Sequence, residues 1–100
     1  GSPDLVFARA RLAVFCDGDF WHGRHWRSLR GKLAKRANAA YWIAKIASNI
    51  ARDRRTVAVL RRHGWRVLRL WETDITRAPE AAAEQVEQSL AQGQAAMRTT

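Results

Sequence analysis

The chain has 100 residues, 47% of them hydrophobic, which suffices for one packed domain and argues against intrinsic disorder. No apolar run approaches the roughly 18 to 20 residues that cross a bilayer, and one cysteine excludes an internal disulfide and a cysteine-rich zinc site. Eighteen Lys and Arg residues against nine Asp and Glu give a net charge of +9, which favours nucleic acid over an anionic membrane as the partner. The composition therefore predicts a cytoplasmic domain in a reducing compartment, with no membrane attachment.

The first third of the chain predicts a β-hairpin followed by a loop. Leu5–Phe7 and Leu12–Cys16 are short runs of strand-forming residues, and the few residues between them suit a tight turn. The two strands are therefore expected to pair antiparallel. Residues Asp17–Leu33 are rich in Trp, His, Arg and Gly without a sustained period, which indicates a functional loop.

The rest of the chain predicts a helix, a strand and a second helix. From Asn38, a good N-cap, to Gly64, a good C-cap, no proline or internal glycine interrupts the sequence. Trp65–Trp71 has a pattern that suits a strand, and Pro79 is typical of a helix start.

In order, these elements predict an α/β fold. The expected architecture is a small mixed β-sheet with an antiparallel hairpin and a long crossover helix packed on it. Residues 1–92 are expected to form the single domain, and 93–100 a flexible tail.

An acidic residue interrupts the apolar side of the long helix. Asp53 lies three residues after Ile50 and four before Val57, so it shares their side of the helix. Two interpretations remain open: Asp53 pairs with an arginine at the edge of the core, or it faces a catalytic cleft. Asn49, one turn earlier, shares this side and is expected to bind the same ligand or orient the same water.

Two further acids are expected at one edge of the hairpin. Asp4 precedes the first strand and Asp17 follows the second, so antiparallel pairing brings them close together. Carboxylates suit a hard cation such as Mg²⁺, although turn-forming aspartates are the plainer interpretation. His22, in the loop that follows, could take a proton from a water that attacks a phosphate, although a lone loop histidine is more often a surface group.

Several motifs in a fixed order resemble the very-short-patch repair (Vsr) endonuclease family. The resemblance covers about residues 3 to 75, and the combination of motifs is specific. They are Pro3-Asp4, Asp17-Gly18-Asp19-Phe20-Trp21-His22-Gly23, Tyr41-Trp42, Asn49-Ile50-Ala51-Arg52-Asp53-Arg54-Arg55, Gly64-Trp65-Arg66-Val67-Leu68 and Trp71-Glu72.

The resemblance implies a restriction-endonuclease-like core that nicks DNA with Mg²⁺ or Mn²⁺, in the best-known members at T:G mismatches. It implies that Asp4 and the main chain of Cys16 bind the metal, that His22 is the catalytic histidine, and that Asp53 supports it. Asp17, at the position of a second family histidine, is expected to add a metal ligand. The residues expected to contact double-stranded DNA are three aromatics, one amide and three arginines: Phe20, Trp21, Trp42, Asn49, Arg24, Arg27 and Arg54.

The chain also departs from the family pattern. The structural zinc of the mismatch-repair members has no ligands here, because its four positions correspond to Asp19, Arg24, Trp26 and Thr73. The lysine of the wider restriction-endonuclease-like pattern is absent at Asp19, which leaves His22 as the candidate base. The family's N-terminal helical region, which carries a glutamate of the catalytic site, precedes the segment that this chain matches, so the domain is expected to be N-terminally incomplete.

The sequence thus favours a Mg²⁺-dependent DNA endonuclease, with a role in DNA repair at mismatches or lesions. A non-catalytic basic DNA-binding module is the first alternative, in which Arg and Trp residues hold phosphates and stack on bases. An RNA-directed nuclease is the second alternative.

Overall fold

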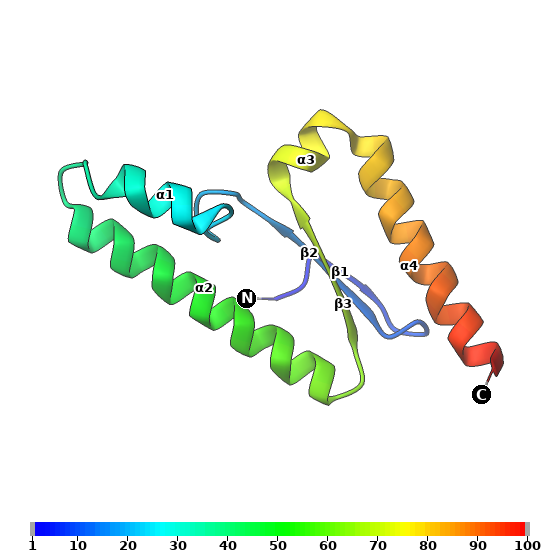
Figure 1. Cartoon of the computed structure of the whole chain (residues 1–100). Coiled ribbons are helices and arrows are strands. Elements are labelled where there is room, and N and C mark those ends of the chain that lie inside the picture. The colour runs from blue at the N-terminus through cyan, green and yellow to red at the C-terminus, as the bar shows by residue number, and fades with distance from the viewer. Residues whose placement is uncertain (1, 100) are drawn as a thin grey trace.

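A three-stranded sheet with helices on both sides forms the centre of the computed structural model, which describes residues 2–99, with side chains over 2–93 (Figure 1). The α/β class agrees with the prediction from the sequence. In chain order the elements are β1 (Leu5–Phe7), β2 (Leu12–Asp17), α1 (Trp26–Leu33), α2 (Ala39–Arg62), β3 (Arg66–Trp71), α3 (Glu72–Arg77) and α4 (Pro79–Thr99).

The sheet is mixed, with strand order β1-β2-β3. β1 pairs antiparallel with β2, with Leu5 opposite Val14, and β2 pairs parallel with β3, with Phe15 opposite Arg69. A parallel pair requires a crossover connection, which the segment containing α1 and α2 supplies. The antiparallel hairpin and the long crossover helix are therefore confirmed.

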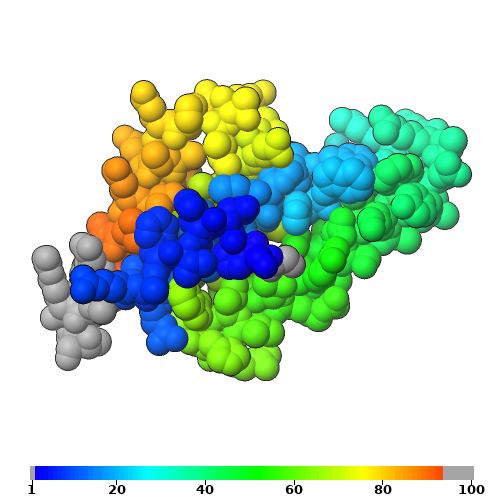
Figure 2. All heavy atoms as spheres, turned by 180° about the vertical axis from the view of Figure 1, so that it is seen from behind, coloured from blue at the N-terminus to red at the C-terminus, as the bar shows by residue number. Residues whose placement is uncertain are grey.

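The two faces of the sheet pack against different helices. Leu12, Val14 and Leu70 are buried on the face that α4 covers, where they meet Ala82, Val86 and Leu90. The alternate residues of β2 and β3 point to the other face, toward α2, because successive side chains of a strand point to opposite sides. Seen from behind, the N-terminal segment (dark blue) crosses the molecule between α2 (green) and α4 (orange) (Figure 2).

Helix α2 is oriented by its apolar side. Ile46 is fully buried and Ile50 and Val57 are half-buried, which confirms the predicted apolar stripe. The helix ends at Arg62, and Gly64, two residues later, has a φ of 84°, a left-handed conformation that glycine adopts without strain. The Gly64 amide donates to the Arg61 carbonyl and the Trp65 amide to the Leu60 carbonyl, which closes the helix and turns the chain into β3.

Two helices occur where the sequence predicts none. The sequence predicts a loop over Asp17–Leu33, whereas α1 occupies Trp26–Leu33. Trp26, Leu29 and Leu33 do recur at helical spacing, but two turns are too short for a clear period. Helix α3 follows β3 directly, with Glu72 and Asp74 in its first turn, where the helix dipole favours negative charge.

Helix α4 begins at Pro79, as the sequence predicts. The flexible tail predicted for 93–100 falls mainly on residues whose side chains lie outside the described part, so it remains a prediction. The single domain predicted over 1–92 also remains a prediction. Within the part of the chain that the structure describes, no helix has the length and apolar character needed to cross a membrane.

Candidate active site

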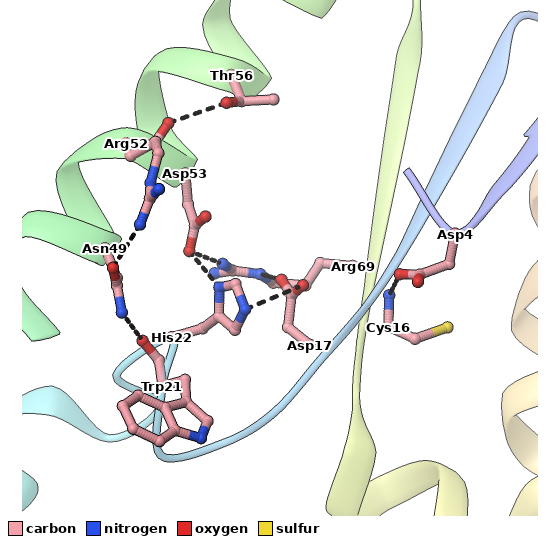
Figure 3. A network of polar contacts seen from close by, with 10 residues as sticks. All are labelled: Asp4, Cys16, Asp17, Trp21, His22, Asn49, Arg52, Asp53, Thr56 and Arg69. Atoms are coloured by element: carbon pink, nitrogen blue, oxygen red, sulfur yellow. Dashed lines mark hydrogen bonds and ion pairs between the residues drawn. The ribbon is translucent and has the colours of Figure 1, made fainter. Parts of the chain in front are cut away.

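Four polar side chains converge between α2 and the sheet (Figure 3). Asp17 ends β2, His22 lies in the following turn, Asp53 projects from α2 and Arg69 lies on β3. They line one cavity of about 730 Å³. Asp17 is 7% exposed, although a carboxylate is rarely buried unless it is paired, so this cluster requires compensating charges.

His22 is held between two carboxylates. Its Nδ1 lies 2.6 Å from Asp53 Oδ2, and its Nε2 lies 3.7 Å from Asp17 Oδ1. A carboxylate accepts a proton donor, so the short contact favours Nδ1–H donating to Asp53 and leaves Nε2 as the nitrogen with a free lone pair. The structure thus brings together three of the residues predicted from the sequence.

Arg69 completes this cluster, and it is not among the site residues that the sequence predicts. Its Nε donates to Asp17 Oδ2 at 2.5 Å, and its Nη2 donates to Asp53 Oδ2 at 2.8 Å. The guanidinium also stacks over the Trp71 ring, 4.6 Å from the ring centroid. The arginine pair expected for Asp53 is therefore present, and Asp53 also lines the cavity, whereas its catalytic role remains a prediction.

A signal for Arg69 is present in the sequence. Strand β3 alternates, and Arg69 shares the side of Val67 and Trp71, which faces α2. Asp53, an acid on the apolar side of α2, and Arg69, a basic residue on the side of β3 that faces α2, have complementary charges. Asp53 and Arg69 could have been paired on that ground.

Asp4 lines the same cavity but lies outside the tight cluster. Its Oδ2 accepts a hydrogen bond of 2.6 Å from the Cys16 amide, and its own amide donates to the Val14 carbonyl at 2.9 Å. In Figure 3 the Asp4 carboxylate is turned toward the Cys16 backbone, apart from the group that His22 forms with Asp17, Asp53 and Arg69. The Cys16 thiol has a raised pKa because of partial burial, then Asp4 and Asp17, so it stays neutral near pH 7.

An aromatic cluster lies beside the cavity. The rings of Phe20, Trp21 and Trp42 contact one another at centroid distances of 5.2 to 5.8 Å, and Tyr41 extends the cluster from Trp42 at 5.1 Å. Trp21 is 49% and Tyr41 60% exposed, which is unusual for large rings. The three aromatics predicted from the sequence to contact DNA thus form one partly exposed surface.

Asn49 is buried on α2 and is hydrogen-bonded within the protein. It is 8% exposed, its amide donates to the Trp21 carbonyl at 2.8 Å, and its Oδ1 accepts from Arg52 Nη2 at 2.5 Å. A buried amide with both ends hydrogen-bonded holds the backbone of the aromatic turn. The Asn49 side chain is therefore already hydrogen-bonded within the protein. Its predicted contacts with a ligand or with DNA remain predictions.

The three predicted DNA-binding arginines occupy different environments. Arg54 lines the cavity and Arg27 is exposed on α1. Arg24, in contrast, donates to both carboxylate oxygens of Asp74 at 3.1 and 2.9 Å and to Asp19 Oδ2 at 3.1 Å. The hydrogen bonds from Arg24 to Asp74 and then Asp19 raise the pKa of its guanidinium, so its charge is already balanced by two acids.

Asp19 links the same network to α3, because its Oδ1 accepts from the Thr73 amide at 3.0 Å. Burial opposes ionisation of Asp19, but the hydrogen bonds from Thr73 and Arg24 outweigh it and lower the pKa below the ordinary value of 3.8. Three of the four positions that the resemblance assigns to zinc ligands, Asp19, Arg24 and Thr73, thus belong to one network of ion pairs and hydrogen bonds.

The donor atoms that line the cavity fit a hard divalent cation. One ligand atom each from Asp17, His22 and Asp53 lie within 4.8 Å of one another, and Asp4 adds a carboxylate to the cavity. Mg²⁺ and Mn²⁺ take carboxylate and carbonyl oxygens. Asp4, Cys16 and Asp17, the residues predicted to supply the ligands, all line this cavity.

Comparison with known proteins agrees with the motifs. A family model described as DNA mismatch endonuclease Vsr matches residues 1–28. The type II nicking enzyme V.NmeDIP of Neisseria meningitidis serogroup C is 40% identical over 90 residues, which are 90% of this chain and 60% of that protein. The type II nicking enzyme V.HpaIIP of Haemophilus parainfluenzae is 37% identical over 90 residues, 90% of this chain and 62% of that protein.

The DNA mismatch endonuclease Vsr of Escherichia coli (strain K12) is 38% identical over 72 residues, which are 72% of this chain and 44% of that protein. No solved structure matches. The chain thus spans less than two thirds of the length of these relatives. It belongs to the family of Vsr and the type II nicking endonucleases.

Proposed function

We propose that this chain carries the catalytic centre of a DNA-nicking endonuclease that uses Mg²⁺ or Mn²⁺ on a restriction-endonuclease-like core. The observation that carries the proposal is the placement of His22 between Asp53 and Asp17 in a cavity next to exposed aromatic rings. A structural ion pair would need no cavity of this size.

His22 is the proposed general base. Asp53 accepts the Nδ1 proton and fixes the orientation of the ring, so Nε2 faces the cavity as the proton acceptor. Nε2 takes a proton from a water whose oxygen forms a bond to phosphorus, while the bond to one ester oxygen breaks and the leaving oxygen takes up a proton. The nicked strand then carries one phosphate monoester and one hydroxyl.

The residues that would hold the cation are Asp4, Asp17 and the main chain of Cys16. When bound, a divalent cation stabilises negative charge that develops on the phosphate and helps to activate water. Asp53 is a positioning residue in this scheme, because it acts on the reaction through the His22 ring.

The substrate proposed for this site is double-stranded DNA. A net charge of +9 supports binding to phosphates, and Phe20, Trp21 and Trp42 supply flat rings that could enter a base step. A mismatched or damaged pair is the easiest to unstack, which supports action at such sites. A cytoplasmic location remains a prediction.

Plasmid nicking tests the proposal. The 100-residue chain and a longer version with its natural flanking sequence should be compared with Mg²⁺, with Mn²⁺ and with EDTA. Nicking that EDTA abolishes is the expected result. Tight duplex binding without nicking by either version would favour the non-catalytic DNA-binding module, and cleavage of RNA alone would favour the RNA-directed nuclease.

A further inference from the structure

We infer that Arg69 is a built-in competitor for the cation site: its guanidinium pairs with Asp17, one of the proposed cation ligands, and ties it to Asp53, so a divalent cation that binds Asp17 does so by displacing Arg69. This inference rests on the proposed function, since it concerns the cation of the same site. It adds a role for a residue that the motifs leave unassigned.

The geometry carries the first step. Arg69 Nε contacts Asp17 Oδ2 at 2.5 Å and Arg69 Nη2 contacts Asp53 Oδ2 at 2.8 Å, so one guanidinium bridges the two carboxylates. Asp53 Oδ2 also accepts the contact from His22 Nδ1 at 2.6 Å. A cation bound to Asp17 Oδ2 would meet the Arg69 guanidinium at hydrogen-bonding distance, so the two positive charges compete for this oxygen.

The charges of the three side chains are the second argument for competition. Asp17 and Asp53 bring two negative charges into a half-enclosed space, and Arg69 supplies the opposite charge from within the cluster. Without a cation these carboxylates would repel each other at short range. Arg69 therefore stabilises the chain in the absence of metal, and the same attraction opposes metal binding.

The exposure of the Arg69 side chain is the third argument for competition. The Arg69 side chain is 36% exposed, whereas Asp17 is 9% and Asp53 19% exposed at their side chains. The arginine has a long side chain with several rotatable bonds, whereas the two acids have short side chains on β2 and α2. Displacement therefore moves the guanidinium into solvent and leaves the carboxylates in place.

Mn²⁺ binding to the DNA-free chain tests this competition by calorimetry. Arg69→Gln removes the competing charge, and Mn²⁺ should bind it about fivefold more tightly or better, which is the low end of typical coupling between two ligands. Arg61→Gln is the matched control, because Arg61 lines the same cavity and has no ion pair among the described residues. Its Mn²⁺ affinity should remain within about twofold of wild type.

Thermal unfolding gives a second readout. Without metal, Arg69→Gln should unfold at a lower temperature than wild type, and Mn²⁺ should raise its midpoint more than it raises that of wild type. If Arg69→Gln does not fold, Arg69→Lys replaces it, because one ammonium group cannot bridge both acids and the change should have the same direction.

Unchanged or weaker Mn²⁺ binding in the Arg69 variant would overturn the inference. Absence of Mn²⁺ binding to wild type and to every variant would overturn it as well, because Asp17 would then hold no cation for Arg69 to compete with. Neither result decides the proposed function, which the plasmid assay tests independently. If wild type nicks DNA but the Arg69 variant binds Mn²⁺ with unaltered affinity, the proposed endonuclease function is retained and the proposed competition by Arg69 is wrong.

Discussion

His22 and Asp53 lie 31 residues apart in the sequence, and their side chains meet at 2.6 Å. Packing of the turn against α2 brings them together. Gly23, with φ of 67°, lies so close to Ile50 that a Cβ atom there would come within 2.5 Å of the isoleucine Cδ1. Glycine at this position therefore lets the turn approach α2, which sets the distance between the imidazole and the carboxylate.

Substitution of the His22–Asp53 pair should show that the two residues act as one unit. His22→Ala should slow nicking about 10²- to 10⁴-fold, because a general base contributes about that much. Asp53→Asn should slow it less, because the amide weakens the orientation of the ring but leaves the imidazole in place. Single-turnover nicking by the natural-length protein measures both effects.

The double variant distinguishes this unit from two independent contributions. The loss in His22→Ala/Asp53→Asn should be close to that of His22→Ala alone, because Asp53 acts through the ring. His63→Ala is a matched control, since His63 is exposed at the far end of α2 and contacts the Val59 carbonyl. Losses that multiply in the double variant would show that Asp53 has a separate role.

Asp4 should affect the response to metal more than the chemistry of proton transfer. Asp4→Ala removes a carboxylate from the cavity wall and the acceptor of the Cys16 amide. We expect the Mg²⁺ concentration for half-maximal nicking to rise about tenfold or more, because each charged oxygen ligand adds strongly to affinity for a hard cation. His22→Ala should leave that concentration nearly unchanged, and equal shifts in both variants would contradict the separate roles.

Much of the fold follows from local signals. The bounds of β1, the start of α4 and the end of α2 just before Gly64 agree with the sequence, because turn residues, capping residues and periodicity act over a few positions. Helices α1 and α3 are too short for their periodicity to stand out. Their boundaries depend on packing against α2 and β3.

The site follows from the sequence only in part. His22, Asp17 and Asp53 are recognisable by motif and by position on an apolar helix side, and the structure brings them together. Arg69 and the buried state of Asn49 depend on which strand residue faces α2 and on how the turn closes. These contacts span 16 and 28 residues, so the alternation of β3 indicates only which side Arg69 faces, and the contacts themselves depend on tertiary packing.

Asn49 should act on DNA through Trp21. Trp21→Ala should weaken duplex binding about tenfold, since one base stacked on an aromatic ring contributes about 1 to 3 kcal/mol. Asn49→Ala removes the amide that donates to the Trp21 carbonyl and should produce a smaller loss in the same direction. In the double variant, Asn49→Ala should add little, as fluorescence anisotropy with a labelled duplex can measure. A full additional loss would indicate that Asn49 contacts DNA directly.

The salt dependence of duplex binding should distinguish Arg27, which is exposed, from Arg24, which is paired with two acids. Binding should fall steeply between about 50 and about 200 mM salt, because cations that contact phosphates release condensed counterions. Arg27→Gln should reduce the slope of log affinity against log salt by about one unit. Arg24→Gln should reduce it less, because Asp19 and Asp74 already balance its charge. Equal changes in slope would show that Arg24 leaves these acids to bind DNA.

The network around Asp19 should make stability depend on pH in the acidic range. The pKa of Asp19 is lowered in the folded chain by hydrogen bonds from Thr73 and Arg24, which outweigh burial. A lowered folded-state pKa contributes stability that is fully present above the unfolded value, near 3.8, and is lost as pH falls through the folded value. Asp19→Asn should therefore unfold a few degrees earlier than wild type near pH 7.

As the pH falls below about 3.8, the unfolding midpoints of wild type and Asp19→Asn should begin to converge, because the stability that the lowered pKa of Asp19 contributes is then progressively lost. Glu84→Gln, an exposed position on α4, is the control and should follow wild type across the whole range. Calorimetric scans from about pH 3 to about pH 7 measure the difference, with the unfolding kept reversible. A gap between wild type and Asp19→Asn that stays constant over this range would show that the Asp19 charge contributes nothing, and that the turn is held to α3 by the neutral hydrogen bond to Thr73 alone.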